Sequence, residues 1–386
     1  MCSKASSPSV VAILLVLAVG CGATPSIDAI VGRPPAAESP PTDPDASQTR
    51  SSSFSADLAW RHLQALTGIG PRPVGSKGNA RARRYLQDEL EKLGLEAESW
   101  EVEYEEGTTS ATDPAERSVA AVPVINLSAI IPGTQSADRL LLVAPFDTRL
   151  SEDFEFVGAN DGASGAAVVL EMARAIVSDP LPYTTQIVFV DGEAPFRVEE
   201  TGRRYQGIGR AGLAARIQQA GVSGIRLMVF LNRVGDAELR IARDLMSERI
   251  YREEFWEAAA VLERDYAFPS DARFENAGID HQSFLLVGFR RIVSIVDTSY
   301  GGDQPPGRYA GTADDTIERC SPKSLETVGV VVLEALDSIS QRLIKIDRFT
   351  GASGTSAVSA PFPEHDLEPA TITQDGPSTG TERDAQ

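Results

Sequence analysis

The segment that decides the fold begins at Arg139, with Arg-Leu-Leu-Leu-Val-Ala (139–144) followed directly by Pro-Phe-Asp-Thr-Arg (145–149). Further along, Gly-Ala-Asn-Asp-Gly-Ala-Ser-Gly (158–165) leads into a helical pattern over Ala163 to Ile176. The short apolar run predicts a buried strand, and the pattern after it predicts a helix. A strand, a polar loop and a helix in this order form the repeating unit of a parallel sheet.

The same alternation continues along the chain. Further apolar runs rich in Val, Ile and Leu predict strands at Val122 to Ile131, Gln186 to Val190, Arg226 to Leu231 and Ile292 to Val296. Helical spacing predicts helices at Ser76 to Gly94, Ala211 to Ala220 and Pro322 to Arg342. We therefore expect an α/β fold, a single three-layer domain with a mostly parallel central sheet and helices on both faces.

Polar segments follow these strands, at the end of a parallel sheet where ligands bind. The first two are the segments at 145–149 and 158–165 quoted above. The others are Asp-Gly-Glu-Ala (191–194), Asn-Arg-Val-Gly-Asp (232–236), Asp-His-Gln-Ser-Phe (280–284) and Tyr-Ala-Gly-Thr-Ala-Asp-Asp-Thr (309–316). Their order along the chain predicts that they meet at one edge of the sheet.

In the order and spacing of these motifs, the sequence resembles the zinc exopeptidase superfamily, which includes aminopeptidases and glutaminyl-peptide cyclotransferases. The resemblance runs from about Arg61 to Leu336, and the string at 158–165 is its most specific part. It implies the phosphorylase/hydrolase-like fold of that superfamily. It also implies a zinc site, whose ligands can be compared with this chain position by position.

Most of the implied zinc ligands are replaced. Asp161 is retained, as a vestigial metal ligand, whereas the other ligand positions hold Phe146, Ala194, Asn232 and Gly311. Catalytic zinc usually has three protein ligands and an open position. Because phenylalanine, alanine and glycine side chains donate nothing to a metal, we expect no cofactor, with zinc only if an unusual ligand set exists.

Two residues match the family's catalytic positions. Glu193 stands where the family has a general acid/base, and Asp280 stands where the cyclases have an acidic residue near that glutamate. Without zinc to polarise a carbonyl group, a structural hydrogen bond is the simpler role for Glu193. In the same way, Asp161 lies just before a helical pattern, where a carboxylate caps a helix.

Three hypotheses follow from these residues. The first is a catalytically degenerate relative that binds a peptide or an amino-terminal group in the old cleft. The second is an active glutaminyl-peptide cyclotransferase or metallo-aminopeptidase that uses an unusual set including Asp161, Glu193, Asp280 and His281. The third is a purely structural envelope protein, which predicts a cleft filled by side chains such as Phe146.

The composition argues against one large class of partner. The 386 residues include 36 Lys and Arg but 55 Asp and Glu, which gives a formal net charge of −19. Nucleic-acid binding depends on clustered basic side chains that neutralise phosphates. We therefore expect no nucleic-acid partner.

The first residues predict export. Lys4 precedes an apolar run from Val10 to Val19, which is too short to span a bilayer but suits a signal peptide. The run ends in Ala-Val-Gly-Cys at 18–21, which resembles the bacterial lipobox and implies lipidation of Cys21. We expect a lipoprotein attached by its lipid anchor to the membrane of the bacterial cell envelope.

These patterns predict four segments. Residues 1–21 are the signal peptide and lipobox, and residues 22–53, rich in Pro, Ser and Ala, are a disordered tether. Residues 54–346 are the zinc-exopeptidase-like domain. Residues 347–386, rich in Gly, Ser, Thr and acidic side chains, are a disordered tail.

Overall fold

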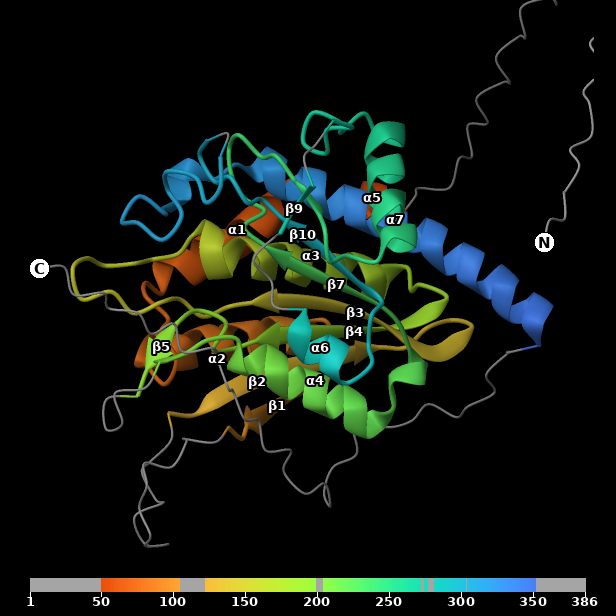
Figure 1. Cartoon of the computed structure of the whole chain (residues 1–386), viewed down its shortest axis with the longest axis horizontal. Helices are drawn as coiled ribbons and strands as arrows, with labels where there is room; N and C mark the ends of the chain where they lie inside the picture. The colour runs from red at the N-terminus through yellow and green to blue at the C-terminus, as the bar shows by residue number, and fades with distance from the viewer. Residues whose placement is uncertain are drawn as a thin grey trace, which may run out of the picture. The chain divides into compact units, whose positions relative to one another are not determined.

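A six-stranded sheet forms the centre of the folded part of the chain (Figure 1). The computed structural model describes residues 50–104, 122–198, 204–271, 274–276, 281–302 and 304–351. Within these ranges the sheet has the strand order β1-β2-β4-β3-β7-β10. Its strands are β1 (Ala97–Val102), β2 (Val124–Ile131), β3 (Ser136–Pro145), β4 (Tyr183–Val190), β7 (Ile225–Asn232) and β10 (Ile292–Val296).

The sheet is parallel over the part that carries the polar loops. Strands β4, β3, β7 and β10 are mutually parallel, with Leu142 of β3 opposite Ile187 of β4 and Val229 of β7. The edge strands β2 and β1 pair antiparallel. The predicted α/β fold with a mostly parallel central sheet is therefore confirmed.

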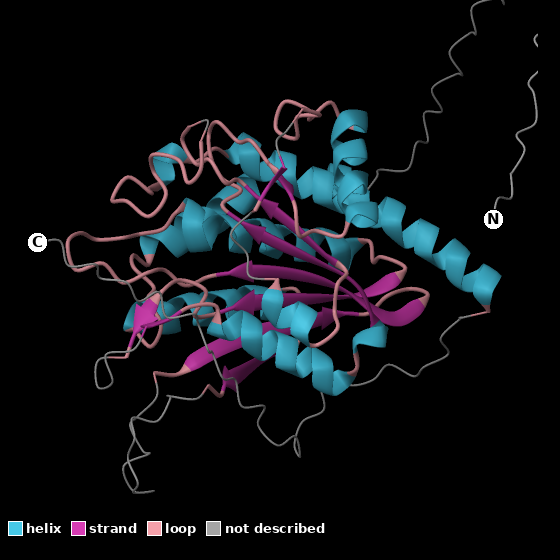
Figure 2. Ribbon diagram, viewed as in Figure 1, coloured by secondary structure: helices cyan, strands magenta, loops and turns pink. Residues whose placement is uncertain are grey.

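Helices cover both faces of the sheet (Figure 2). One face is covered by α1 (Ala56–Gly68), α2 (Lys77–Lys92), α3 (Gly165–Ser178), α5 (Arg249–Val261) and α7 (Pro322–Thr350). The other face is covered by α4 (Ile208–Ala220) and α6 (Gln282–Leu286). Short elements complete the described chain: β5 (Phe196–Arg197), β6 (Arg204–Tyr205), β8 (Arg243–Asp244), β9 (Phe274–Glu275) and short helical turns at Arg50–Ser53, Asn160–Ser164, Val222–Gly224 and Ile317–Arg319.

The two hydrophobic cores follow from the alternation of side chains along each strand. In β3, Leu140, Leu142 and Ala144 face the core beneath α1, α3 and α7. Leu141 and Val143 face the core beneath α4 and α6. A strand that is buried on both faces has to be apolar at every position, which is why these runs are continuous in the sequence.

The sequence did not predict β1, because this strand is not apolar at every position. β1 has the sequence Ala-Glu-Ser-Trp-Glu-Val and is an edge strand, so only Trp100 and Val102 are buried. Glu101 is exposed and Glu98 pairs with Arg216 of α4, and these charged residues break the apolar run that marks the central strands. The amphipathic helices α1 and α5 were likewise not predicted.

The folded domain is longer at both ends than the predicted range 54–346. At the start, Arg50 forms an ion pair with Asp337, and the hydroxyl of Ser51 donates to Glu334, both on α7. At the end, α7 continues to Thr350 rather than to Arg342. The predicted signal peptide, the lipidation site Cys21 and most of the tether and tail lie outside the described residues.

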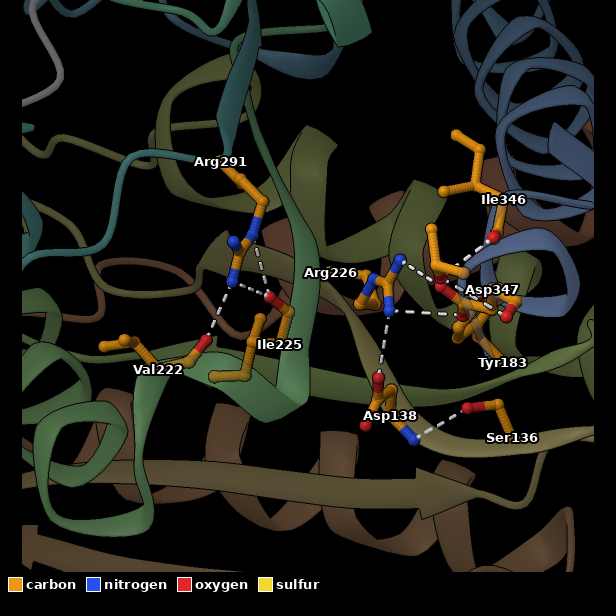
Figure 3. Close-up of polar contacts among 10 residues, drawn as sticks. Ser136, Asp138, Tyr183, Val222, Ile225, Arg226, Arg291, Ile346 and Asp347 are labelled. Atoms are coloured by element: carbon orange, nitrogen blue, oxygen red, sulfur yellow. Dashed lines mark hydrogen bonds and ion pairs between the residues drawn. The ribbon is translucent and has the colours of Figure 1, made fainter. Parts of the chain in front are cut away.

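Asp347 explains why the last helix continues (Figure 3). This aspartate, which we expected to begin the tail, is buried and forms an ion pair with Arg226 at 2.8 Å. The hydroxyl of Tyr183 donates to the same carboxylate, and Arg226 also pairs with Asp138 at 3.2 Å. These contacts attach the end of α7 to the amino-terminal ends of β4 and β7, opposite the polar loops. Among the described residues, no helix is both long enough and apolar enough to cross a membrane.

The contacts of Asp347 predict that the end of α7 contributes to stability. In an Asp347→Ala variant, Arg226 and Tyr183 lose their shared acceptor, and we expect the free energy of unfolding to fall by about 1–3 kcal/mol. Urea unfolding followed by circular dichroism measures this change. Lys345→Ala on the exposed side of the same helix is the matched control, and equal stability of the two variants would contradict the assignment.

Candidate functional site

A cavity of about 210 Å³ opens at the carboxyl ends of the parallel strands. Residues at or just after the ends of β3, β4, β7 and β10 line it, namely Pro145, Asp147, Glu193, Asn232 and Val296. Parallel strands place their carboxyl ends at one edge, so segments far apart in sequence meet there. The cavity therefore lies at the edge of the sheet where the sequence predicts the site.

Phe146 does not occupy the cavity. Its side chain is fully buried in the core beneath α1 and α3, where it continues the alternation of Leu142 and Ala144. The neighbouring Pro145 lines the cavity instead. The assignment of Phe146 to a former ligand position is therefore wrong by one residue: the position that faces the site holds proline, which also donates nothing to a metal.

Asp161, the retained ligand of the resemblance, is held by an amide. The side-chain nitrogen of Asn232 donates to Asp161 Oδ1 at 2.9 Å, while the Asn232 oxygen accepts from the backbone nitrogen of Gly162 at 3.2 Å. Helix α3 begins only at Gly165, after Ser164, and no side chain caps it. The helix-cap interpretation of Asp161 is therefore wrong, because this carboxylate belongs to the cavity wall.

Asp315 holds the backbone of the segment that carries Asp161. The two oxygens of Asp315 accept from the backbone nitrogens of Asn160 at 2.7 Å and Asp161 at 3.1 Å. The hydroxyl of Tyr300 donates to the same carboxylate at 3.2 Å. Burial, together with the charge of Asp161, raises the pKa of Asp315 to about 7.

Glu193 forms a closed pair with an arginine. Its Oε2 lies 3.1 Å from Nη1 of Arg210, and its Oε1 accepts from the Arg210 backbone nitrogen at 3.1 Å. Both side chains are more than nine-tenths buried, at 9% and 7% exposure. A general base has to be free to take a proton from its substrate. In this structure Glu193 lines the cavity and is paired with Arg210.

The position of Gly207 allows this pair to form. Gly207 precedes α4 with a φ of 69°, in the left-handed region that favours glycine. A β-carbon at this position would lie 2.3 Å from Nη2 of Arg210. The glycine therefore leaves room for the guanidinium to reach Glu193.

Asp147 is the third carboxylate of the wall. Its oxygens accept from the backbone nitrogens of Glu193 at 3.2 Å and Ala194 at 3.0 Å. Burial, together with the neighbouring charges of Asp191 and Glu193, raises the pKa of Asp147 well above its ordinary value. Asp147 therefore supports the turn after β4.

An arginine lies where the family's last ligand would project. Gly311 has a φ of 69°, and a β-carbon there would lie 3.2 Å from Nη1 of Arg149. The same nitrogen donates to the carbonyl oxygen of Gly311 at 3.1 Å. The guanidinium of Arg149, which lines the cavity, thus lies beside the position where the resemblance implies a metal ligand.

The residues present do not fit a catalytic zinc ion. Asp161 is bonded to an amide, Ala194 and Gly311 have no donor atoms, and the positive charge of Arg149 faces the site. Within the described ranges, no three His, Cys, Asp or Glu side chains gather closely enough to hold a metal. The donor set therefore disagrees with the zinc chemistry of the superfamily.

The remaining candidates lie away from the cavity wall or outside the description. His281 is buried, with Nε2 at 3.0 Å from the hydroxyl of Ser294 and 3.4 Å from Asp244 Oδ2. It connects the start of α6 to β10 and β8 and is not among the cavity-lining residues. Asp280 lies outside the described residues.

Sequence reasoning missed the arginines that shape the site. Arg149, Arg210 and Arg233 all line the cavity. Arg149 and Arg233 immediately follow motif residues, which is a signal that could have found them. Arg210 lies 17 residues after Glu193, on a different element, and only the fold brings the two together.

The fold and this strand-end cavity define a protein of the zinc-exopeptidase architecture. The model of peptidase family M28 matches residues 126–336, which is more than half of the chain. The chain belongs to this family.

Solved structures agree with this assignment. A glutaminyl cyclase from an Acidobacteriales bacterium is 26% identical, with a TM-score of 0.63, over 81% of this chain and all of that one. A Zn-dependent exopeptidase from Parabacteroides distasonis shares the fold at 20% identity, with a TM-score of 0.59, over 74% of this chain and 98% of that one. A Bos taurus glutaminyl-peptide cyclotransferase-like protein is 31% identical over 132 residues, which are 32% of each chain. This chain therefore spans about a third of the length of the curated relatives it matches.

The buried carboxyl of Asp315 predicts a pH dependence of stability. Its pKa is about 7 in the folded chain, whereas an unfolded aspartate has a pKa of about 3.9. The folded state therefore binds this proton more tightly. Its contribution to the free energy of unfolding should fall by about 1.4 kcal/mol per pH unit as the pH rises from about 4 to about 7, and then level off.

Urea unfolding of the protein and of an Asp315→Asn variant at several pH values measures this contribution. Comparing the two cancels the effect of other groups, such as His62, whose pKa is lowered by burial. The stability advantage of the unmodified protein over the variant should shrink as the pH rises. A constant difference would show that Asp315 has an ordinary pKa.

Proposed function

We propose that this chain is a catalytically degenerate member of family M28 that binds a peptide in the former active-site cleft. The observation that carries the proposal is the buried pair of Glu193 and Arg210 in a cavity where the neighbouring ligand position holds Ala194. In the superfamily zinc polarises the substrate carbonyl and the glutamate moves the proton. In this chain most zinc ligands are replaced, and Glu193 is paired with Arg210.

An active glutaminyl-peptide cyclotransferase or aminopeptidase is the competing function. The named activities of the similar structures favour it. The buried position of His281 argues against it, because this imidazole bonds to Ser294 and is not part of the cavity wall. The ligand set of Asp161, Glu193, Asp280 and His281 therefore lacks support from the geometry.

A purely structural role receives less support. That hypothesis predicts a cleft filled by Phe146, whereas Phe146 lies in the core and the cavity is open. An open cavity with polar walls costs stability unless a ligand or water satisfies those walls. The open cavity therefore favours the peptide-binding hypothesis over the purely structural one.

The proposed location is the bacterial cell envelope. It rests on the apolar run before Cys21 and on the small residues at 18–20. A lipid on Cys21 would attach the domain to a membrane through the segment before Arg50. The negative charge of the chain fits an extracytoplasmic binding protein without a nucleic-acid partner.

Zinc content tests the loss of the metal site. After zinc loading and removal of unbound ion, we expect the protein to retain far less than about one zinc per chain, because only Asp161 remains as a ligand. Glutaminyl-cyclase and aminopeptidase assays on the same sample should show no turnover. Stoichiometric zinc that is lost on Asp161→Ala, together with turnover, would sink the proposal.

A gain-of-site variant provides the matched control. Ala194→Glu with Gly311→His restores two ligands beside Asp161, and Arg149→Ala removes the guanidinium that would contact the new imidazole. A non-glycine residue at positive φ costs about 1–2 kcal/mol, which is small beside the roughly 10 kcal/mol or more of structural zinc binding. We expect this triple variant to retain about one zinc per chain.

Lipid attachment is tested separately. When the full gene is expressed in bacteria with radiolabelled palmitate, the protein should incorporate label and fractionate with membranes. Cys21→Ser removes the thiol that would carry the lipid, so the label should disappear. Equal labelling of both proteins would show that Cys21 is not the lipidation site.

A further inference from the structure

The cavity has hydrogen-bond donors that the protein itself does not use. The Nε atoms of Arg210 and Arg233 are buried, and neither has a hydrogen-bond partner among the described residues. Arg210 is only 6% exposed. A buried donor without a partner costs about 1–3 kcal/mol. The two arginines therefore carry an energetic cost, which a ligand relieves only where its acceptor atoms reach these covered nitrogens.

Most carboxylate oxygens of the same wall already accept hydrogen bonds from the chain, with Oδ2 of Asp161 as the exception among the described contacts. Glu193 accepts from Arg210, Asp161 accepts from Asn232, and Asp147 accepts from two backbone nitrogens. The fully buried Arg72, whose guanidinium donates only to backbone carbonyl oxygens within the described chain, adds a positive charge that interacts with Asp161. A cationic ligand would find few free acceptors here.

Two of the cavity arginines have no carboxylate partner. Within the described ranges neither Arg149 nor Arg233 forms an ion pair, although both line the cavity. Arg149 is oriented by the carbonyl oxygen of Gly311 and lies 5.9 Å from the centre of the Phe156 ring. Guanidinium groups arranged in this way bind carboxylate and phosphate oxygens, often through two parallel hydrogen bonds.

We propose that the former metal cavity is an anion-binding site, in which Arg149, Arg210 and Arg233 receive the carboxylate of a peptide ligand. This inference rests on the proposed binding function and specifies which part of the ligand enters the cavity. The volume of about 210 Å³ is below the roughly 300–1,000 Å³ of drug-sized sites. It suits a terminal group rather than a whole peptide.

Isothermal titration calorimetry on the full chain, after its zinc content has been measured, tests the proposal. The probes are N-acetyl-trialanine with a free carboxylate, the same peptide as its carboxyl-terminal amide, trialanine amide with a free amino terminus, and inorganic phosphate. We expect the acetylated acid to bind saturably and the acetylated amide not to bind. If phosphate binds and the acetylated acid does not, the cavity is still an anion site, but its ligand is a phosphate rather than a peptide carboxylate.

Arg233→Gln is the decisive variant, because it removes two cavity donors and the charge while keeping a side chain of similar reach. We expect it to raise the dissociation constant of the bound anion at least about tenfold. Arg61→Gln, at an exposed position of α1, is the control and should bind as the unmodified protein does. Arg210 is left intact, because its loss would leave Glu193 buried without its partner.

The outcomes separate the two proposals. Binding only of the free-amine peptide, binding of no probe, or equal affinity of the Arg233→Gln and Arg61→Gln variants would overturn the anion site while leaving a metal-free protein. Stoichiometric zinc with turnover would instead overturn the degenerate function. Thermal unfolding of each variant shows that it is folded before binding is compared.

Discussion

Burial of carboxylates at the ends of the parallel strands is the constraint on which this site depends. The fold brings Asp147, Asp161, Glu193 and Asp315 to one edge of the sheet, where like charges in a poorly hydrated space repel one another. In a zinc enzyme the metal ion compensates such a cluster. Without the metal ligands, the compensation has to come from the chain itself.

The protein provides this compensation with several different groups. An arginine pairs with Glu193, an amide holds Asp161, and backbone nitrogens hold Asp147 and Asp315. Each arrangement gives a buried carboxylate a donor from the chain, and one of these carboxylates, Asp161, stands at a ligand position of the family. Breaking one partner of such a buried pair costs more than the pair contributes, so these groups depend on one another. The buried carboxylates of the site are therefore compensated by groups of the chain itself.

Membership of family M28 and the altered cavity are compatible, because the fold and the chemistry depend on different residues. The apolar strands and the helices on both faces determine the architecture. The few side chains after the strand ends determine the chemistry, and they can change while the core remains. The opposite end of the sheet, where Asp347 meets Arg226, contributes to stability without taking part in the site.

The sequence by itself determined the class of fold and the edge at which the site lies. Short apolar runs rich in Val, Ile and Leu, separated by helical patterns, indicate the strands of a parallel sheet, whose polar successors meet at the carboxyl ends. The sequence did not predict β1, whose charged residues break the apolar run, and it misplaced Phe146, whose side chain belongs to the core. Only the tertiary structure decided that Arg210 pairs with Glu193 and that Arg149 reaches the space beside Gly311. Local spacing carries no signal for such contacts, because they join residues on different elements through the packing of the whole domain.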